Sequence, residues 1–118
     1  MALKISSEVI KDAEGKIPYR VFQSGGREHY NLRIWLDGPA QELDQVEKVE
    51  YLLHPSFRDR HPSSFDRDGK FALFIWTWGM FAIEATIHYK DGRIEPQEFY
   101  LSYDLPEDDG TNYLLLPN

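Results

Sequence analysis

The segment MFAIEATIHYKDGR, residues 80–93, is the clearest indicator of the fold. Its apolar side chains recur at every second position and would share one face, formed by Phe81, Ile83, Ala85, Ile87 and Tyr89. A period of two is typical of a strand with one face in a core and the other toward water. The Asp91-Gly92 pair is a strong signal for a tight hairpin turn. The segment therefore predicts a strand that turns back into a second strand, IEPQEFYL at 94–101.

Other segments show the same alternation and are predicted to be strands: KISSEV at 4–9, PYRVFQS at 18–24, HYNLRIWL at 29–36 and KVEYLLH at 48–54. KFALFIW at 70–76 is apolar on both sides, which predicts a strand buried deep within a sandwich. Pro96 cannot donate to a ladder, so the strand that contains it is expected at a sheet edge or at a bulge. The final YLLLPN is either a last strand or the beginning of a further segment. The expected core comprises Leu32, Ile34, Val49, Tyr51, Leu53, Phe81, Ile83, Ile87 and Phe99.

About seven or eight short strands separated by turn signals favour an all-β fold, a two-sheet antiparallel β-sandwich. The length of 118 residues suits a single domain spanning 1–118. PAQELDQVEK at 39–48 is the best helical candidate and predicts no more than a short turn.

Composition narrows the class of function. No apolar run is long enough for a membrane span, and the start MALKISSEV lacks the apolar region of a signal peptide, so a cytoplasmic location without membrane contact is expected. The chain has no cysteine, which excludes disulfides, thiolate zinc sites and cysteine nucleophiles. The net charge of −7 disfavours nucleic acid and would attract a lysine-rich peptide, although acidity also serves solubility.

Residue patterns that would indicate catalysis or metal binding do not occur. The four histidines are far apart in sequence, so no metal site is expected. FDRDGK at 65–70 lacks the alternating ligands and closing glutamate of a calcium loop and is predicted to be a turn. Neither a glycine-rich phosphate loop nor a nucleophile elbow is present. We therefore expect neither an enzyme nor a bound cofactor.

Two short stretches, LHPSF and TWGMF, place large aromatic residues where strands end. If both loops lie at one pole of the sandwich, Phe57 and Trp78 can face each other across a slot that suits a flat, polarisable group. The hydroxyl of Ser56 could form a hydrogen bond at the rim, and the backbone beside Gly79 is uncrowded. The alternative interpretation is that these aromatic residues plug the ends of the core.

These stretches, extended to VEKVEYLLHPSF at 46–57 and TWGMFAIEATIHYKDGR at 77–93, resemble the YEATS domain family, in particular its prokaryotic-type members. Members carry a Leu-His-x-Ser/Thr-Phe stretch and, about one strand later, Gly-Trp/Tyr-Gly/Ala-x-Phe. The resemblance runs from about Tyr30 to Tyr103. It implies an immunoglobulin-like sandwich that reads acylated lysine.

The resemblance also implies a role for individual residues of the site, namely His54, Ser56, Phe57, Thr77, Trp78, Gly79 and Phe81. Phe57 and Trp78 would enclose the acyl group between their rings. Ser56 would hydrogen-bond the acyl-lysine amide, and the backbone N–H of Trp78 would bond the acyl carbonyl. His54 would shape the pocket floor and orient Ser56, while Phe81 would support the loop from the core side.

The family pattern and this sequence differ at a few positions around the expected pocket. Thr77 stands where the family usually has glycine, so a different backbone path is expected in this loop. Met80 replaces a residue that is often small or acidic, and Glu28 lies near the place from which some members supply a further aromatic residue. Gly79 would leave the far end of the pocket open.

The expected function is a non-enzymatic reader whose partner is an acylated-lysine peptide or protein. Crotonyl is expected to be preferred over acetyl, because a planar conjugated group can stack on both rings. The alternative is a protein–protein interaction or ligand-sensing module of a prokaryotic signalling or defence protein, with a divergent pocket.

Overall fold

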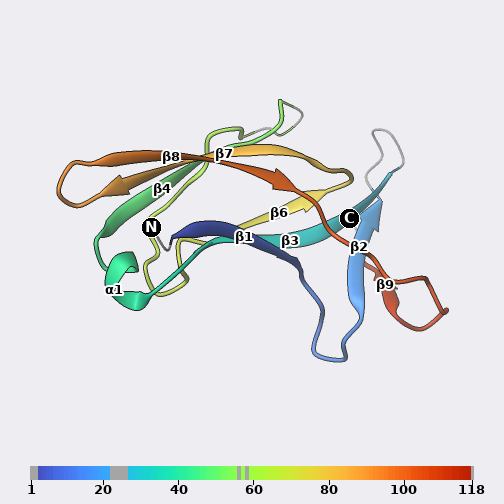
Figure 1. Cartoon of the computed structure of the whole chain (residues 1–118). Helices are drawn as coiled ribbons and strands as arrows, with labels where there is room; N and C mark the ends of the chain where they lie inside the picture. Colours follow the sequence, from blue (N-terminus) through green and yellow to red (C-terminus); the bar gives the residue numbers. More distant parts are fainter. Residues whose placement is uncertain (1–2, 22–26, 56, 58, 118) are drawn as a thin grey trace.

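A computed structural model of the chain describes residues 3–21, 27–55, 57 and 59–117 and shows two facing β-sheets, so the expected β-sandwich is confirmed (Figure 1). The strands are β1 Lys4–Val9, β2 Ile17–Val21, β3 Glu28–Asp37, β4 Val46–Leu52, β5 Ser63–Ser64, β6 Leu73–Thr77, β7 Phe81–Tyr89, β8 Ile94–Leu101 and β9 Tyr113–Leu115. The short helix α1, Ala40–Leu43, lies in the segment predicted to form a helical turn. No helix among the described residues is long and apolar enough to span a membrane.

The first sheet is built around the long strand β3. On one edge of β3, the strands β1 and β2 pair with it one after the other, and β6 pairs with the opposite edge. All of these pairs are antiparallel. The last strand, β9, pairs with β2 in parallel, so YLLLPN does contribute a final strand. This parallel pair departs from the all-antiparallel sheet that the sequence predicted.

The second sheet has the order β5-β4-β7-β8. Strands β7 and β8 form the predicted hairpin, in which Gly92 has a φ of +94° and its N–H donates to the Tyr89 carbonyl at 3.0 Å. A positive φ is the reason that this turn needs glycine. Pro96 lies in β8, at the edge of the sheet, as its missing N–H predicted.

The core lies between the two sheets and consists of the inward faces that the alternation predicted. Along β3, every second residue is buried, from Tyr30 to Leu36. Of the nine expected core residues, Phe81 and Phe99 are half-buried and pack against the core, and the other seven are buried.

The prediction that residues 70–76 form a strand buried within the sandwich is wrong. Lys70 and Phe71 have positive φ values of 58° and 56°, so they form a left-handed turn, and the strand begins only at Leu73. The turn itself was predicted from FDRDGK, and the Phe71 N–H closes it by donating to the Asp66 carbonyl at 2.8 Å. The resulting strand β6 lies at a sheet edge, and Phe74 is 60% exposed.

A buried hydrogen bond holds this left-handed turn against the core. The hydroxyl of Tyr51 donates to the Phe71 carbonyl at 2.7 Å, and the Phe71 side chain is fully buried. Burial raises the pKa of the Tyr51 hydroxyl above its ordinary value of 10. The bond satisfies a carbonyl that the turn would otherwise leave buried and unpaired.

Candidate functional site

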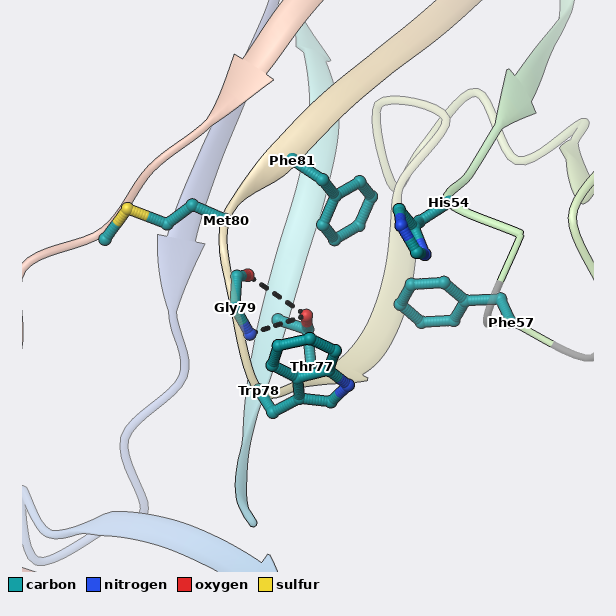
Figure 2. Close-up of a pocket in the computed structure, with 7 residues that line it drawn as sticks. All are labelled: His54, Phe57, Thr77, Trp78, Gly79, Met80 and Phe81. Atoms are coloured by element: carbon teal, nitrogen blue, oxygen red, sulfur yellow. Dashed lines mark hydrogen bonds between the residues drawn. The ribbon is translucent and has the colours of Figure 1, made fainter. Parts of the chain in front are cut away.

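Two loops meet in a small cavity of about 50 Å³ (Figure 2). The loop after β4 contributes His54 and Phe57, and the connection from β6 to β7 contributes the rest. The lining residues are His54, Phe57, Thr77, Trp78, Gly79, Met80 and Phe81. Six of these belong to the predicted site. The seventh predicted residue, Ser56, lies outside the described residues.

Three rings pack together on one side of the cavity. The centroid of the Phe57 ring lies 5.5 Å from that of Phe81, and the His54 ring meets Phe81 edge-on at 5.9 Å. A tight turn places Phe57, because its N–H donates to the His54 carbonyl at 3.0 Å. Phe81 is half-buried and packs against the core. It therefore connects the two loop residues, His54 and Phe57, to the core.

The hydroxyl of Thr77 shapes the opposite loop. Thr77 is buried, and its Oγ1 donates to the Gly79 carbonyl at 3.2 Å and accepts from the Gly79 N–H at 3.4 Å. Hydroxyl side chains commonly close turns by bonding the backbone two residues on. Thr77 therefore closes the turn at whose apex Trp78 stands. The sequence interpretation noted Thr77 as a departure but missed this role, which the Thr-x-Gly spacing could have signalled.

Trp78 projects from this turn and remains 46% exposed. Figure 2 shows its ring and the ring of Phe57 projecting from the two loops toward the same space, while the Met80 side chain points away. Among the ring contacts of the described residues, none joins Phe57 to Trp78.

The guanidinium of Arg27 stacks on Trp78, with its central carbon 4.1 Å from the ring centroid. Such a cation–π contact fixes the orientation of an exposed ring. The sequence interpretation did not assign Arg27, although it placed the missing third aromatic residue in this segment. The far side of the turn is open, because a Cβ added at Gly79 would meet no atom within 4 Å.

The described residues that line the cavity include no carboxylate, lysine or arginine. No group of three histidine, aspartate or glutamate side chains in the described part of the chain could hold a metal ion. The cavity offers aromatic faces, a histidine ring and backbone groups of a tight turn, which together suit a small flat neutral group.

Comparisons with known proteins identify the family and the fold. A family model described as the prokaryotic YEATS domain matches residues 30–102. Solved structures of yeast Yaf9 are similar in fold: the protein described as the yeast AF-9 homolog has a TM-score of 0.60 and 18% identity, over 89% of this chain and 73% of that one. The Yaf9 YEATS domain recognizing an H3K122suc peptide has a TM-score of 0.59 and 16% identity, over 84% and 68%. The Yaf9 YEATS domain bound to H3K27ac has a TM-score of 0.58 and 17% identity, over 88% and 70%. Among curated proteins there is no match.

Proposed function

Because this chain belongs to the prokaryotic YEATS domain family, we propose that it is a non-enzymatic reader that binds acylated lysine between Phe57 and Trp78. One observation carries the proposal: two aromatic rings from separate loops project into one open space, and none of the described residues that line it is an aspartate, glutamate, lysine or arginine. Acylation removes the charge of lysine and adds a flat amide. An unmodified ammonium would lose water in this cavity and gain no carboxylate in return.

The related structures support the same class of ligand. The Yaf9 domains were described with an H3K122suc peptide and with H3K27ac, both modified histone peptides. In the proposed complex, the backbone N–H of Trp78 donates to the acyl carbonyl, and the hydroxyl of Ser56 bonds the lysine amide. Phe81 holds Phe57 in place through a ring contact, and the His54 ring packs on Phe81.

The two aromatic rings bear on the choice of acyl group. Crotonyl is planar, so it can lie flat on both rings without losing rotamer freedom. It also buries more apolar area than acetyl. The proposed order of affinity is crotonyl, then butyryl or propionyl, then acetyl, with unmodified lysine not bound.

Titration calorimetry with capped single residues tests the proposal. Each ligand is an Nα-acetyl lysine amide that carries one acyl group, with the unmodified lysine as the matched control. Each additional buried CH₂ contributes about 0.8 kcal/mol, so butyryl should bind at least tenfold more tightly than acetyl. Equal affinity for acetyl and crotonyl would argue against stacking as the source of binding. Strongest binding of unmodified lysine would argue against the reader function altogether.

The stacking of Arg27 on Trp78 favours a second candidate, a protein-interaction or ligand-sensing module with a divergent pocket. A guanidinium on one face of the ring leaves only the other face for a ligand. If neither the wild-type domain nor a folded Arg27→Ala variant bound any acyl-lysine, this second function would replace the first.

A further inference from the structure

Strand β6 has an edge that no other described strand pairs. It pairs with β3 along one side, over five residues from Leu73 to Thr77. No strand pair in the described part of the chain involves its other side. Unpaired strand edges present backbone N–H and C=O groups that an extended chain can bond.

The register shows which backbone groups point outward. In a strand, alternate residues direct their N–H and C=O groups to opposite edges. The Leu36 N–H donates to the Lys70 carbonyl at 2.9 Å, on the side of β3 where β6 lies. Leu32, four residues earlier, points the same way, so Leu32 and its partner Ile75 form a hydrogen-bonded pair.

It follows that Phe74 and Trp76, the neighbours of Ile75, turn their backbone groups away from β3. Each offers one N–H donor and one C=O acceptor to the free edge. Their side chains share the outer face of the first sheet, where Phe74 is exposed and the Arg20 guanidinium lies 4.7 Å from the centroid of the Trp76 ring. The free edge is therefore bordered by two aromatic side chains.

A groove of about 350 Å³ runs along this edge. It is lined by Leu53, Phe57, Asp59, Pro62, Leu73, Phe74, Ile75 and Trp76. Four consecutive residues of β6 take part, with side chains on both faces, so the groove follows the backbone edge of the strand. The opposite wall is fixed to β4, because the Tyr51 N–H donates to the Pro62 carbonyl and the Leu53 N–H to the Arg60 carbonyl, both at 2.8 Å.

The groove lies next to the candidate acyl-lysine cavity, because Phe57 lines both spaces. Trp78 follows Trp76 by two residues along the same chain. A ligand that places one side chain against Trp78 therefore has its neighbouring residues at the end of the β6 edge.

Building on the proposed function, we propose that the polypeptide flanking the acylated lysine adds to β6 as an extra strand, hydrogen-bonded to the backbone of Phe74 and Trp76. An extended strand advances about 3.3 Å per residue, so about four residues on one side of the modified lysine reach from Trp78 to Phe74. Asp59 is the single charged residue among the described residues that line the groove, and the chain carries a net charge of −7. Both favour a basic residue in the flanking peptide.

Comparison of a short and a long ligand tests the inference. The short ligand is the capped single crotonyl-lysine, and the long ligand is a peptide with four residues on each side of the crotonyl-lysine, including arginine. Two or more added backbone hydrogen bonds of ordinary net strength should make the long ligand bind at least about tenfold more tightly. This gain comes from the edge of β6, whereas the affinity for the short ligand comes from the aromatic cavity.

The Phe74→Pro variant removes one outward N–H and leaves the bonds to β3 intact, since proline is tolerated on strand edges where the N–H faces solvent. Phe74→Ala is the matched control, because it removes the same ring and keeps the N–H. Phe74→Pro should lose most of the gain from the flanking residues, relative to Phe74→Ala, and both variants should bind the short ligand as the wild-type domain does.

Backbone amide hydrogen exchange tests the inference in the wild-type domain, without any substitution. The N–H groups of Phe74 and Trp76 should exchange faster than that of Ile75 in the free domain. They should become protected when the long peptide binds, and remain unprotected with the short ligand.

Four results would overturn the inference. Equal affinity for the short and long ligands, or unchanged exchange at Phe74 and Trp76, would refute strand addition and leave the reader function intact. Protection of these amides that increased with protein concentration in the absence of peptide would show that the edge pairs with a second copy of the chain. Failure of both ligands to bind would refute the proposed function, and the inference with it.

Discussion

Replacing Trp78 with alanine should remove most of the affinity for the ligand while leaving the domain folded. The side chain is 46% exposed. A tryptophan presents up to about 250 Å², so roughly 110 Å² remains for a ligand to cover. At about 25 cal/mol per Å² this area is worth about 3 kcal/mol, which corresponds to a loss of roughly 150-fold in affinity.

The same estimate from surface area limits the loss of folding stability in Trp78→Ala. The covered half of Trp78 amounts to roughly 140 Å², which sets an upper bound of about 3.5 kcal/mol on the loss of stability. Domains of this size are commonly stable by about 5–15 kcal/mol, so the variant should remain folded. At about 4 °C per kcal/mol, its melting temperature should fall by no more than roughly 14 °C.

The measurement is calorimetric titration with capped crotonyl-lysine, paired with thermal unfolding followed by far-UV circular dichroism. Phe65→Ala is the matched control. Phe65 is 65% exposed and has the Lys48 ammonium 5.7 Å from its ring centroid, but it does not line the cavity. It should bind the ligand normally. Unfolding of Trp78→Ala would mean that the ring belongs to the core, and an affinity within threefold of wild type would mean that the ring does not touch the ligand.

Two further predictions follow from buried hydroxyl groups. Thr77→Val should lose about 1 kcal/mol of stability and bind crotonyl-lysine more weakly, because the turn that carries Trp78 loses its side-chain bonds to Gly79. Thr77→Ser keeps the hydroxyl, so its stability in urea unfolding and its affinity in titration should match those of the wild-type domain. Normal binding by Thr77→Val together with loss of binding by Thr77→Ser would show that the methyl group, not the hydroxyl, matters. Tyr51→Phe should lose about 1–3 kcal/mol at neutral pH, since it leaves the buried Phe71 carbonyl unpaired. Burial raises the pKa of Tyr51 above 10 in the folded state, so the stability linked to its proton is fully present below about pH 10 and is lost as the pH rises further. The urea midpoint of Tyr51→Phe should therefore fall less steeply above pH 10 than that of wild type, and parallel curves would contradict this reasoning.

Much of the fold could be predicted because strand periodicity is a local property. The alternation in 29–36, 48–54 and 81–89 identified which side chains face the core, and each of these segments is a strand with that face inward. The Asp91-Gly92 hairpin was equally local, since it needs only a residue that accepts a positive φ.

The error at 70–76 shows where local reasoning fails. An apolar run can be a strand covered on both faces or a turn followed by an edge strand, and its composition is the same in both cases. Here Phe71 is buried in a left-handed turn held by the Tyr51 hydroxyl, a residue 20 positions away. Phe74 is exposed because no strand covers its side of the sheet.

The candidate site also combines features that the sequence predicted with a contact that it could not predict. The sequence motifs identified the two loops and the residues His54, Phe57 and Trp78, which the structure brings to one cavity. The stacking of Arg27 on Trp78 could not be read from spacing, because the two residues are 51 positions apart and meet only in the folded chain.

By itself, the sequence determined the long strands β3, β4 and β7, the inward face of each and the two aromatic loops, because these follow from patterns a few residues long. Tertiary structure alone decided the order of the strands, the parallel pairing of β2 with β9 and the free edge of β6. These features depend on which distant segments form backbone hydrogen bonds with each other. The physical reason is that backbone N–H and C=O groups are the same in every residue, so the side-chain pattern specifies a strand but not its neighbour.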